Sequence, residues 1–198
     1  EIFLHAARSM PKADLWIFII RDEHDDNKEF TNIIRDNFVN FEIISTNKKT
    51  EGQASSCLLS LKFLKDSDII TVCSCDLAFK IKSLNYFNLF KKYQGVIFTS
   101  KKNHHALKNP NQFGWVNNIS NTINNISCKE IASSNPINDD IIIGAFGFCN
   151  KVFFKKSIDY IINKNIRIKN EFYLDVAMQQ MFFLNYKSNL LKKHCRFP

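Results

Sequence analysis

Six consecutive apolar residues, Leu15 to Ile20, constrain the fold of this chain more than any other part of its sequence. An unbroken apolar run of this length is typical of a parallel strand that is covered on both faces. Apolar side chains at helical spacing follow it, and these are Phe30, Ile33, Ile34 and Phe38. A second strand is predicted over 41–44. Strand and helix therefore alternate from the start, which predicts an α/β fold.

The alternation continues to residue 100. The pattern predicts a helix over 54–64, a strand over 68–74, a helix over 83–93 and a strand over 95–100. Strands that alternate with helices through short connections favour a three-layer arrangement around a parallel sheet. We therefore expect a Rossmann-like α/β/α sandwich with a mixed, mainly parallel central sheet.

The pattern changes beyond residue 103, where Asn-rich turns separate short segments. Segments over 114–116 and 122–129 predict a small antiparallel β insertion. A strand over 141–149 and helices over 152–163 and 172–184 follow, and the tail 187–198 is basic and weakly patterned. The sequence contains no repeat or linker, so we expect a single domain over 1–198.

The composition excludes several classes of protein. The 198 residues are 45% hydrophobic and 13% aromatic, with 5 Gly and 4 Pro, which excludes disordered and collagen-like chains. The formal charge of +8 is spread over short Lys pairs rather than an Arg-rich stripe, so we expect no nucleic-acid partner. No apolar run approaches ~18 residues, so we expect no membrane partner. The six cysteines form no C-x-x-C pair and are interpreted as reduced core residues of a cytoplasmic protein.

Ligands of open α/β sheets bind beyond the carboxyl ends of the strands. That rule predicts that a ligand would contact the loops after the predicted strands, which are 21–26, 45–53, 75–80 and 101–115. In the second loop, Gly52 allows a close approach of the backbone to a ligand, and Gln53 can read a flat hydrogen-bonding edge. In the third, the carboxylate of Asp76 follows a buried strand and could hold Mg²⁺. A capped loop before a core helix and an Asp that caps a loop are the alternative interpretations.

Two later segments carry further candidates. Gly114 could expose an N–H to a ligand, Trp115 could stack on it or pack in the core, and Lys129 could neutralise a phosphate or be solvated. Glu171 and Asp175 are four residues apart at the start of a predicted helix, so they share one face. They could bind a ligand or complement the helix dipole.

In combination, five segments resemble the sugar-phosphate-type nucleotidyltransferases, in particular the branch of bacterial capsule and surface-polysaccharide pathways. The matching segments are Thr50–Ala54, Cys75–Asp76, Phe113–Val116, Ile142–Phe148 and Asn170–Asp175. The resemblance implies a GT-A-like nucleotidyltransferase fold. It also implies that a phosphomonoester attacks the α-phosphorus of a nucleoside triphosphate and releases pyrophosphate. It favours CTP as the nucleotide and a phosphorylated small molecule or sugar phosphate as the acceptor.

The resemblance also implies roles for individual residues. Asp76 would bind the Mg²⁺ cofactor, and Lys129 would take part in catalysis by positioning the acceptor phosphate. The nucleotide would lie against Glu51, Gly52, Gln53 and Cys75. The acceptor would lie against Gly114, Trp115, Gly144, Glu171 and Asp175.

The chain departs from the family pattern in three places. It has no N-terminal glycine-rich loop to grip the triphosphate, and residues 1–8 resemble the helix that follows that loop. It has no late glycine-rich segment with a second metal-binding Asp, and Cys128 stands where an acidic residue usually precedes Lys129. We therefore expect a fragment, truncated at both ends, that is weakly active or inactive by itself.

Two other functions remain open. A GT-A glycosyltransferase would use a nucleotide-sugar donor and usually has Asp-x-Asp after the equivalent strand, where this chain has Ser74-Cys75-Asp76. A non-catalytic domain would bind a nucleotide without turnover. A requirement for a triphosphate and release of pyrophosphate distinguish the transferase from both.

Overall fold

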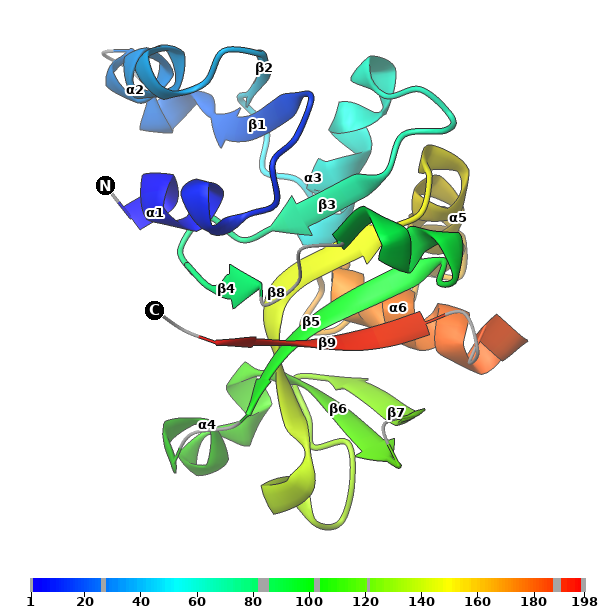
Figure 1. Cartoon of the computed structure of the whole chain (residues 1–198). Coiled ribbons are helices and arrows are strands. Elements are labelled where there is room, and N and C mark those ends of the chain that lie inside the picture. The colour runs from blue at the N-terminus through cyan, green and yellow to red at the C-terminus, as the bar shows by residue number, and fades with distance from the viewer. Residues whose placement is uncertain are drawn as a thin grey trace.

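The computed structural model describes residues 2–25, 28–81, 86–101, 104–120, 122–186 and 190–196, and these form an α/β fold (Figure 1). The α-helices are α1 (Ile2–Ser9), α2 (Glu29–Asn37), α3 (Gln53–Leu58), α4 (His104–Lys108), α5 (Lys151–Asn163) and α6 (Leu174–Met181). The strands are β1 (Trp16–Arg21), β2 (Phe41–Thr46), β3 (Ile70–Cys73), β4 (Lys80–Ile81), β5 (Gly95–Lys101), β6 (Gly114–Ile119), β7 (Thr122–Cys128), β8 (Asp140–Phe148) and β9 (Leu190–Arg196).

The strands belong to two sheets. β1 and β2 pair in parallel as a two-stranded sheet. The other seven strands form a mixed sheet in the order β4-β9-β5-β8-β6-β7, in which β3 also pairs with β8. In Figure 1 the small sheet lies with α1 and α2 at one end of the molecule, and the β6–β7 hairpin lies at the other. That hairpin is the predicted antiparallel insertion.

The large sheet is mixed, as predicted, but most of its pairs are antiparallel. β8 runs antiparallel to both β3 and β5, so β3 and β5 share one direction with β8 between them. β9 is parallel to β5. The prediction of a mainly parallel sheet is therefore wrong. The strand that follows the β6–β7 hairpin returns through the centre of the sheet in the reverse direction, which the strand–helix alternation of the first half does not reveal.

Gly144 divides β8 into two parts with different neighbours. On the edge away from β5, residues 145–148 pair with β3, whereas Asp140 and Ile141 pair with β6. Gly144 lies between these parts at a φ of 69°, a left-handed value that glycine adopts without penalty. One strand can therefore serve two neighbours, and the N–H of Ser74, just after β3, donates to the Gly144 carbonyl oxygen at 3.1 Å.

Both faces of the large sheet are covered, as the three-layer prediction requires. On one face α3, α5 and α6 pack over a buried cluster that includes Ile97, Phe146 and Phe154. On the other face the cluster includes Phe79 and Phe98, whose ring centroids lie 5.7 Å apart. Since neighbouring side chains of a strand point to opposite faces, β5 contributes to both clusters.

Most predicted elements are present, and the largest differences lie in one helix and in the tail. The helix predicted over 83–93 is a short 3-10 helix, η3 (Tyr86–Lys91), and residues 83–85 lie outside the described part of the chain. The weakly patterned tail contains β9, which the sequence did not predict. None of the described helices has the length and apolar character needed to span a membrane.

A buried ion pair joins β9 to β8. The Nζ of Lys192 lies 2.5 Å from Oδ2 of Asp140, and both side chains are only 7% exposed. Lys192 also donates to Oδ1 of Asn118 at 2.7 Å. The neighbouring Asp139 is buried as well and accepts hydrogen bonds from Asn117 and Ser133. Charges this deeply buried persist only where partners compensate for the lost water, so this network fixes β9 against the sheet.

Candidate functional site

Two segments that are far apart in the sequence lie in direct contact. We call residues Thr50–Ala54 the glycine loop and residues Asn170–Asp175 the acidic segment. The N–H of Phe172 donates to the Glu51 carbonyl oxygen at 2.8 Å, and the N–H of Ala54 donates to the Phe172 carbonyl oxygen at 3.0 Å. A Cβ at Gly52, where φ is 114°, would lie 2.7 Å from both the nitrogen and the oxygen of Phe172. Only glycine fits this approach.

The remaining candidates of the glycine loop, Glu51 and Gln53, flank Gly52. Gln53 is the first residue of α3 and is half-buried. The carboxylate of Glu51 is exposed and forms an ion pair with Arg167 at 2.9 Å. Sequence reasoning assigned no role to Arg167. Its position just before the acidic segment was the available signal, but its partner Glu51 is distant in the sequence.

Gly114 has a different role from the predicted one. It is buried, and a Cβ at this position would lie 2.2 Å from Oδ2 of Asp175 in the first turn of α6. The carboxyl group of Asp175 therefore occupies the space that a side chain would need. The structure corrects the expectation that Gly114 exposes an N–H to a ligand, since this glycine permits packing of Asp175.

Lys129 lies beside the acidic segment. Its Nζ donates to the Gln112 carbonyl oxygen at 2.7 Å and lies 5.5 Å from the ring centroid of Tyr173. Burial raises the pKa of Tyr173 to about 12, helped by a hydrogen bond with Glu171. Lys129, Tyr173, Glu171 and Asp175 therefore form one cluster. Sequence reasoning missed Tyr173, although its place between the two acidic residues was a signal.

Asp175 of this cluster is buried, and so is Cys128, which precedes Lys129 in the chain. Burial raises the pKa of Asp175 to about 6, although a backbone hydrogen bond and the charge of Lys129 oppose the rise. Burial also raises the pKa of the Cys128 thiol well above its usual range, and the negative charge of Asp175 adds to the effect. Cys128 is therefore a neutral core thiol, whereas Asp175 changes charge close to neutral pH.

We expect Asp175→Asn to change the pH dependence of stability. Because the folded-state pKa of Asp175 lies above its ordinary value of 3.8, the folded protein binds more protons than the unfolded chain between about pH 4 and pH 6. The contribution of Asp175 to stability falls as pH rises through this window. The unfolding free energy of the variant minus that of the wild type should therefore grow by up to about 3 kcal/mol from pH 4 to pH 7. Urea titrations at each pH measure it, and a constant difference would contradict the expectation.

Asp76 and Cys75 are exposed directly after β3. Ser74 fixes this loop to β8, since its N–H donates to the Gly144 carbonyl oxygen at 3.1 Å and its side chain packs close to Gly144. Among the described residues, no group of three or more His, Cys, Asp or Glu side chains could hold a metal ion. A single accessible carboxylate fits Mg²⁺, which keeps several waters and is usually held by one or two carboxylates together with substrate phosphates.

Trp115 is a core residue. Its side chain is fully buried against Ala106 and Ile141, and its Nε1 donates to the Pro110 carbonyl oxygen at 2.9 Å. The prediction that Trp115 binds substrate is therefore wrong. An apolar aromatic next to a glycine has the same sequence signature in a core as at a ligand, and burial decides between the two.

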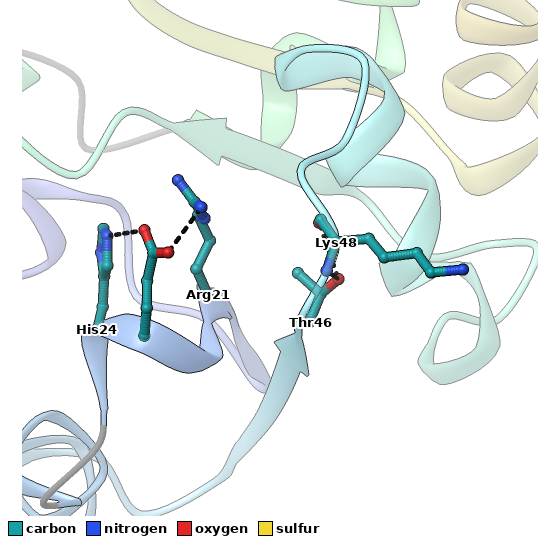
Figure 2. Close-up of polar contacts among 5 residues, drawn as sticks. Arg21, His24, Thr46 and Lys48 are labelled. Atoms are coloured by element: carbon teal, nitrogen blue, oxygen red, sulfur yellow. Dashed lines mark hydrogen bonds and ion pairs between the residues drawn. The ribbon is translucent and has the colours of Figure 1, made fainter.

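Exposed polar side chains occupy the carboxyl ends of β1 and β2 (Figure 2). Glu23 accepts from Arg21 at 2.8 Å and lies 3.3 Å from Nε2 of His24. The side chain of Lys48 points away from Arg21 and His24 (Figure 2). Asp26 and residues 102–103 of the predicted ligand loops lie outside the described residues.

An open groove of about 430 Å³ on the outer side of α5 contains none of the predicted site residues. Four of its charged side chains pair with each other, Lys155 with Asp159 and Lys151 with Asp66. We therefore place the candidate site at the glycine loop and the acidic segment.

Comparison with known proteins identifies the fold of this chain. No family model matches the sequence, and no curated protein matches it. The nucleoside-diphosphate-sugar pyrophosphorylase from Vibrio cholerae RC9 has a TM-score of 0.75 and 15% identity, over 98% of this chain and 79% of that chain. The inositol-1-phosphate CTP transferase from T. maritima has a TM-score of 0.61 and 15% identity, over 92% of this chain and 66% of that chain.

The similar structures include a protein of a different activity. A mannose-6-phosphate isomerase from Helicobacter pylori has a TM-score of 0.65 and 16% identity, over 99% of this chain and 88% of that chain. Identities this low show the fold alone, and this chain has the fold of the nucleotidyltransferases. Because one fold can host several activities, function must be argued from the site.

Proposed function

We propose that this chain is a nucleotidyltransferase domain. It binds a nucleoside triphosphate, with CTP favoured, and joins it to a phosphorylated small molecule or sugar phosphate for capsule or surface-polysaccharide precursor synthesis in the cytoplasm. The observation that carries the proposal is the contact between the glycine loop and the acidic segment. Two backbone hydrogen bonds hold the predicted nucleotide-binding and acceptor-binding residues together.

The reaction requires positioning more than a nucleophilic side chain. An oxygen of the acceptor phosphate forms a bond to the α-phosphorus, the bond to the oxygen that bridges to the β-phosphorus breaks, and pyrophosphate leaves. Gln53, with one acceptor and two donor positions, would read the base beside Gly52, whose backbone packs against Phe172. The ammonium group of Lys129 would attract the acceptor phosphate, and Glu171 would accept hydrogen bonds from acceptor hydroxyl groups.

Asp76 would hold the Mg²⁺ cofactor. The accessible carboxylate supports this assignment, and Mg²⁺ there would neutralise phosphate charge. Mg²⁺ and Lys129 would then be two positively charged neighbours of the phosphate groups. The other proposed ligand-binding side chains of the site are largely acidic.

A thermal-shift panel of CTP, UTP, dTTP, GTP and ATP with Mg²⁺ tests the proposal. A nucleotide at about 100 times its dissociation constant should raise the unfolding free energy by ~2.7 kcal/mol, and we expect CTP to give the largest shift. A larger shift with a nucleoside diphosphate-sugar would favour the glycosyltransferase instead. A CTP-induced shift that no phosphorylated acceptor increases further would favour a non-catalytic domain. No shift with any nucleotide would overturn the proposal.

A further inference from the structure

Arg167 occupies the junction between the glycine loop and the acidic segment. Its Nη2 donates to Oε1 of Glu51 at 2.9 Å, and its Nη1 donates to the Asn170 carbonyl oxygen at 3.2 Å. Its Nε donates to Oδ1 of Asn165 at 2.6 Å. The guanidinium carbon lies 3.9 Å from the ring centroid of Phe172. One side chain therefore contacts both segments through two of its nitrogens and its planar face, while its third nitrogen is held by Asn165.

The acidic segment begins in a tight turn that Arg167 supports. Ile168 and Glu171 exchange two backbone hydrogen bonds, both of 3.0 Å. The two residues between them, Lys169 and Asn170, have φ values of 50° and 65°. Two successive left-handed residues define a two-residue hairpin turn, in which at least one of the two positions is usually glycine. Neither residue is glycine, so neighbouring contacts must hold this conformation, and the bond from Arg167 to Asn170 is one of them.

Backbone hydrogen bonds fix the position of the glycine loop relative to the acidic segment. The two backbone hydrogen bonds of Phe172 go to Glu51 and Ala54, on either side of Gly52. The Arg167–Glu51 ion pair closes the same junction from the outside, where the Glu51 side chain is 63% exposed. An ion pair this exposed contributes little alone. The planar fork of Arg167 and its stacking on Phe172 are what make the contact specific, and lysine offers neither.

We propose that Arg167 is a positioning residue that couples the glycine loop to the acidic segment, so that a nucleotide bound at the first also orders the second. The inference rests on the proposed function and assigns to Arg167 the role of preparing the acceptor side of the site. Ordering one segment orders the other because they share two hydrogen bonds and the Arg167 side chain. The acceptor then loses less conformational freedom when it binds second.

Amide hydrogen exchange with CTP and Mg²⁺ tests this coupling. In the wild type, CTP should slow exchange over 50–54 and also over 170–175, by at least about fivefold in each. In Arg167→Met the protection should remain over 50–54 and fall over 170–175, because only the two backbone hydrogen bonds of Phe172 still join the segments. Arg167→Lys, which keeps the charge and loses the fork, should restore part of it. Lys164→Met, which removes an exposed cation at the end of α5, is the matched control and should behave as the wild type.

The outcomes separate the inference from the proposed function. Wild-type protein that shows no CTP-dependent protection anywhere would overturn both. Protection confined to 50–54 in the wild type, or equal protection of both segments in Arg167→Met, would overturn the role of Arg167 and leave the proposed function intact. Amide hydrogen exchange measured without CTP shows whether each variant is folded. If the coupling is correct, Arg167→Met alone should speed exchange of the Ala54 amide, while amides of β5 and β8 keep wild-type rates.

Discussion

Asp140→Ala should lower the free energy of unfolding by about 3–5 kcal/mol, the largest loss of stability that we expect from a single side chain in this protein. The substitution removes the carboxylate that pairs with the buried Lys192, whose Nζ retains the bond to Asn118 among the described residues. The carboxylate also accepts a hydrogen bond from Asn118, which is lost as well. Chemical denaturation of the variant beside the wild type measures the effect.

Two further variants show whether the instability of Asp140→Ala comes from the unpaired buried charge or only from a lost contact. Asp140→Leu combined with Lys192→Met removes both charges and should be less destabilised than the single variant. Asp159→Ala removes the exposed pair with Lys155 on α5 and should cost only about 0.3–0.5 kcal/mol. If Asp140→Ala were no more harmful than Asp159→Ala, the assignment of a stabilising role to the buried network would be wrong.

Gly52→Ala should destabilise the protein by about 2–4 kcal/mol and abolish nucleotide binding. The new Cβ would lie 2.7 Å from two backbone atoms of Phe172, and alanine is strained at a φ of 114°. Backbone atoms cannot rotate away as a side chain can, so the glycine loop must separate from the acidic segment. Denaturation measures the first effect, and a CTP thermal shift measures the second.

Gly144→Ala is the matched control for Gly52→Ala. Gly144 also has a positive φ, but the nearest atom to its added Cβ is the Ser74 Oγ at 3.0 Å, which can move by side-chain rotation. We expect a smaller loss of stability than for Gly52→Ala. A Gly52→Ala variant that is as stable as Gly144→Ala would show that the contact with Phe172 is not a constraint on this position.

The local pattern of the sequence predicted the elements better than their pairing. The apolar run before Arg21 gave a strand, and the helix predicted over 152–163 is α5, because the burial of side chains determines each local pattern. The direction of β8 depends on the connections between strands, which side-chain periodicity does not encode. β9 was missed because Lys192 resembles a surface residue until its partner Asp140 is known.

The candidate site shows the same division. Gly52 and Glu171 could be singled out separately, since each residue type suits a ligand, but their contact through Phe172 depends on the tertiary fold. Trp115 and Gly114 are residue types that also occur in binding loops, but both are buried in the core. Tyr173 and Arg167 carry no motif of their own. Their importance comes from contacts with residues distant in the chain.

Calorimetric titration of CTP, with and without Mg²⁺, into the wild type, Gln53→Ala and Asp76→Asn measures the proposed nucleotide and metal binding separately. We expect Mg²⁺ to strengthen CTP binding to the wild type. Gln53→Ala should weaken binding about tenfold with and without the metal, by loss of hydrogen bonds to the base. Asp76→Asn should retain the metal-free affinity and lose the enhancement by Mg²⁺. A wild type that does not bind CTP, or an Asp76→Asn variant in which Mg²⁺ still strengthens binding, would contradict the account.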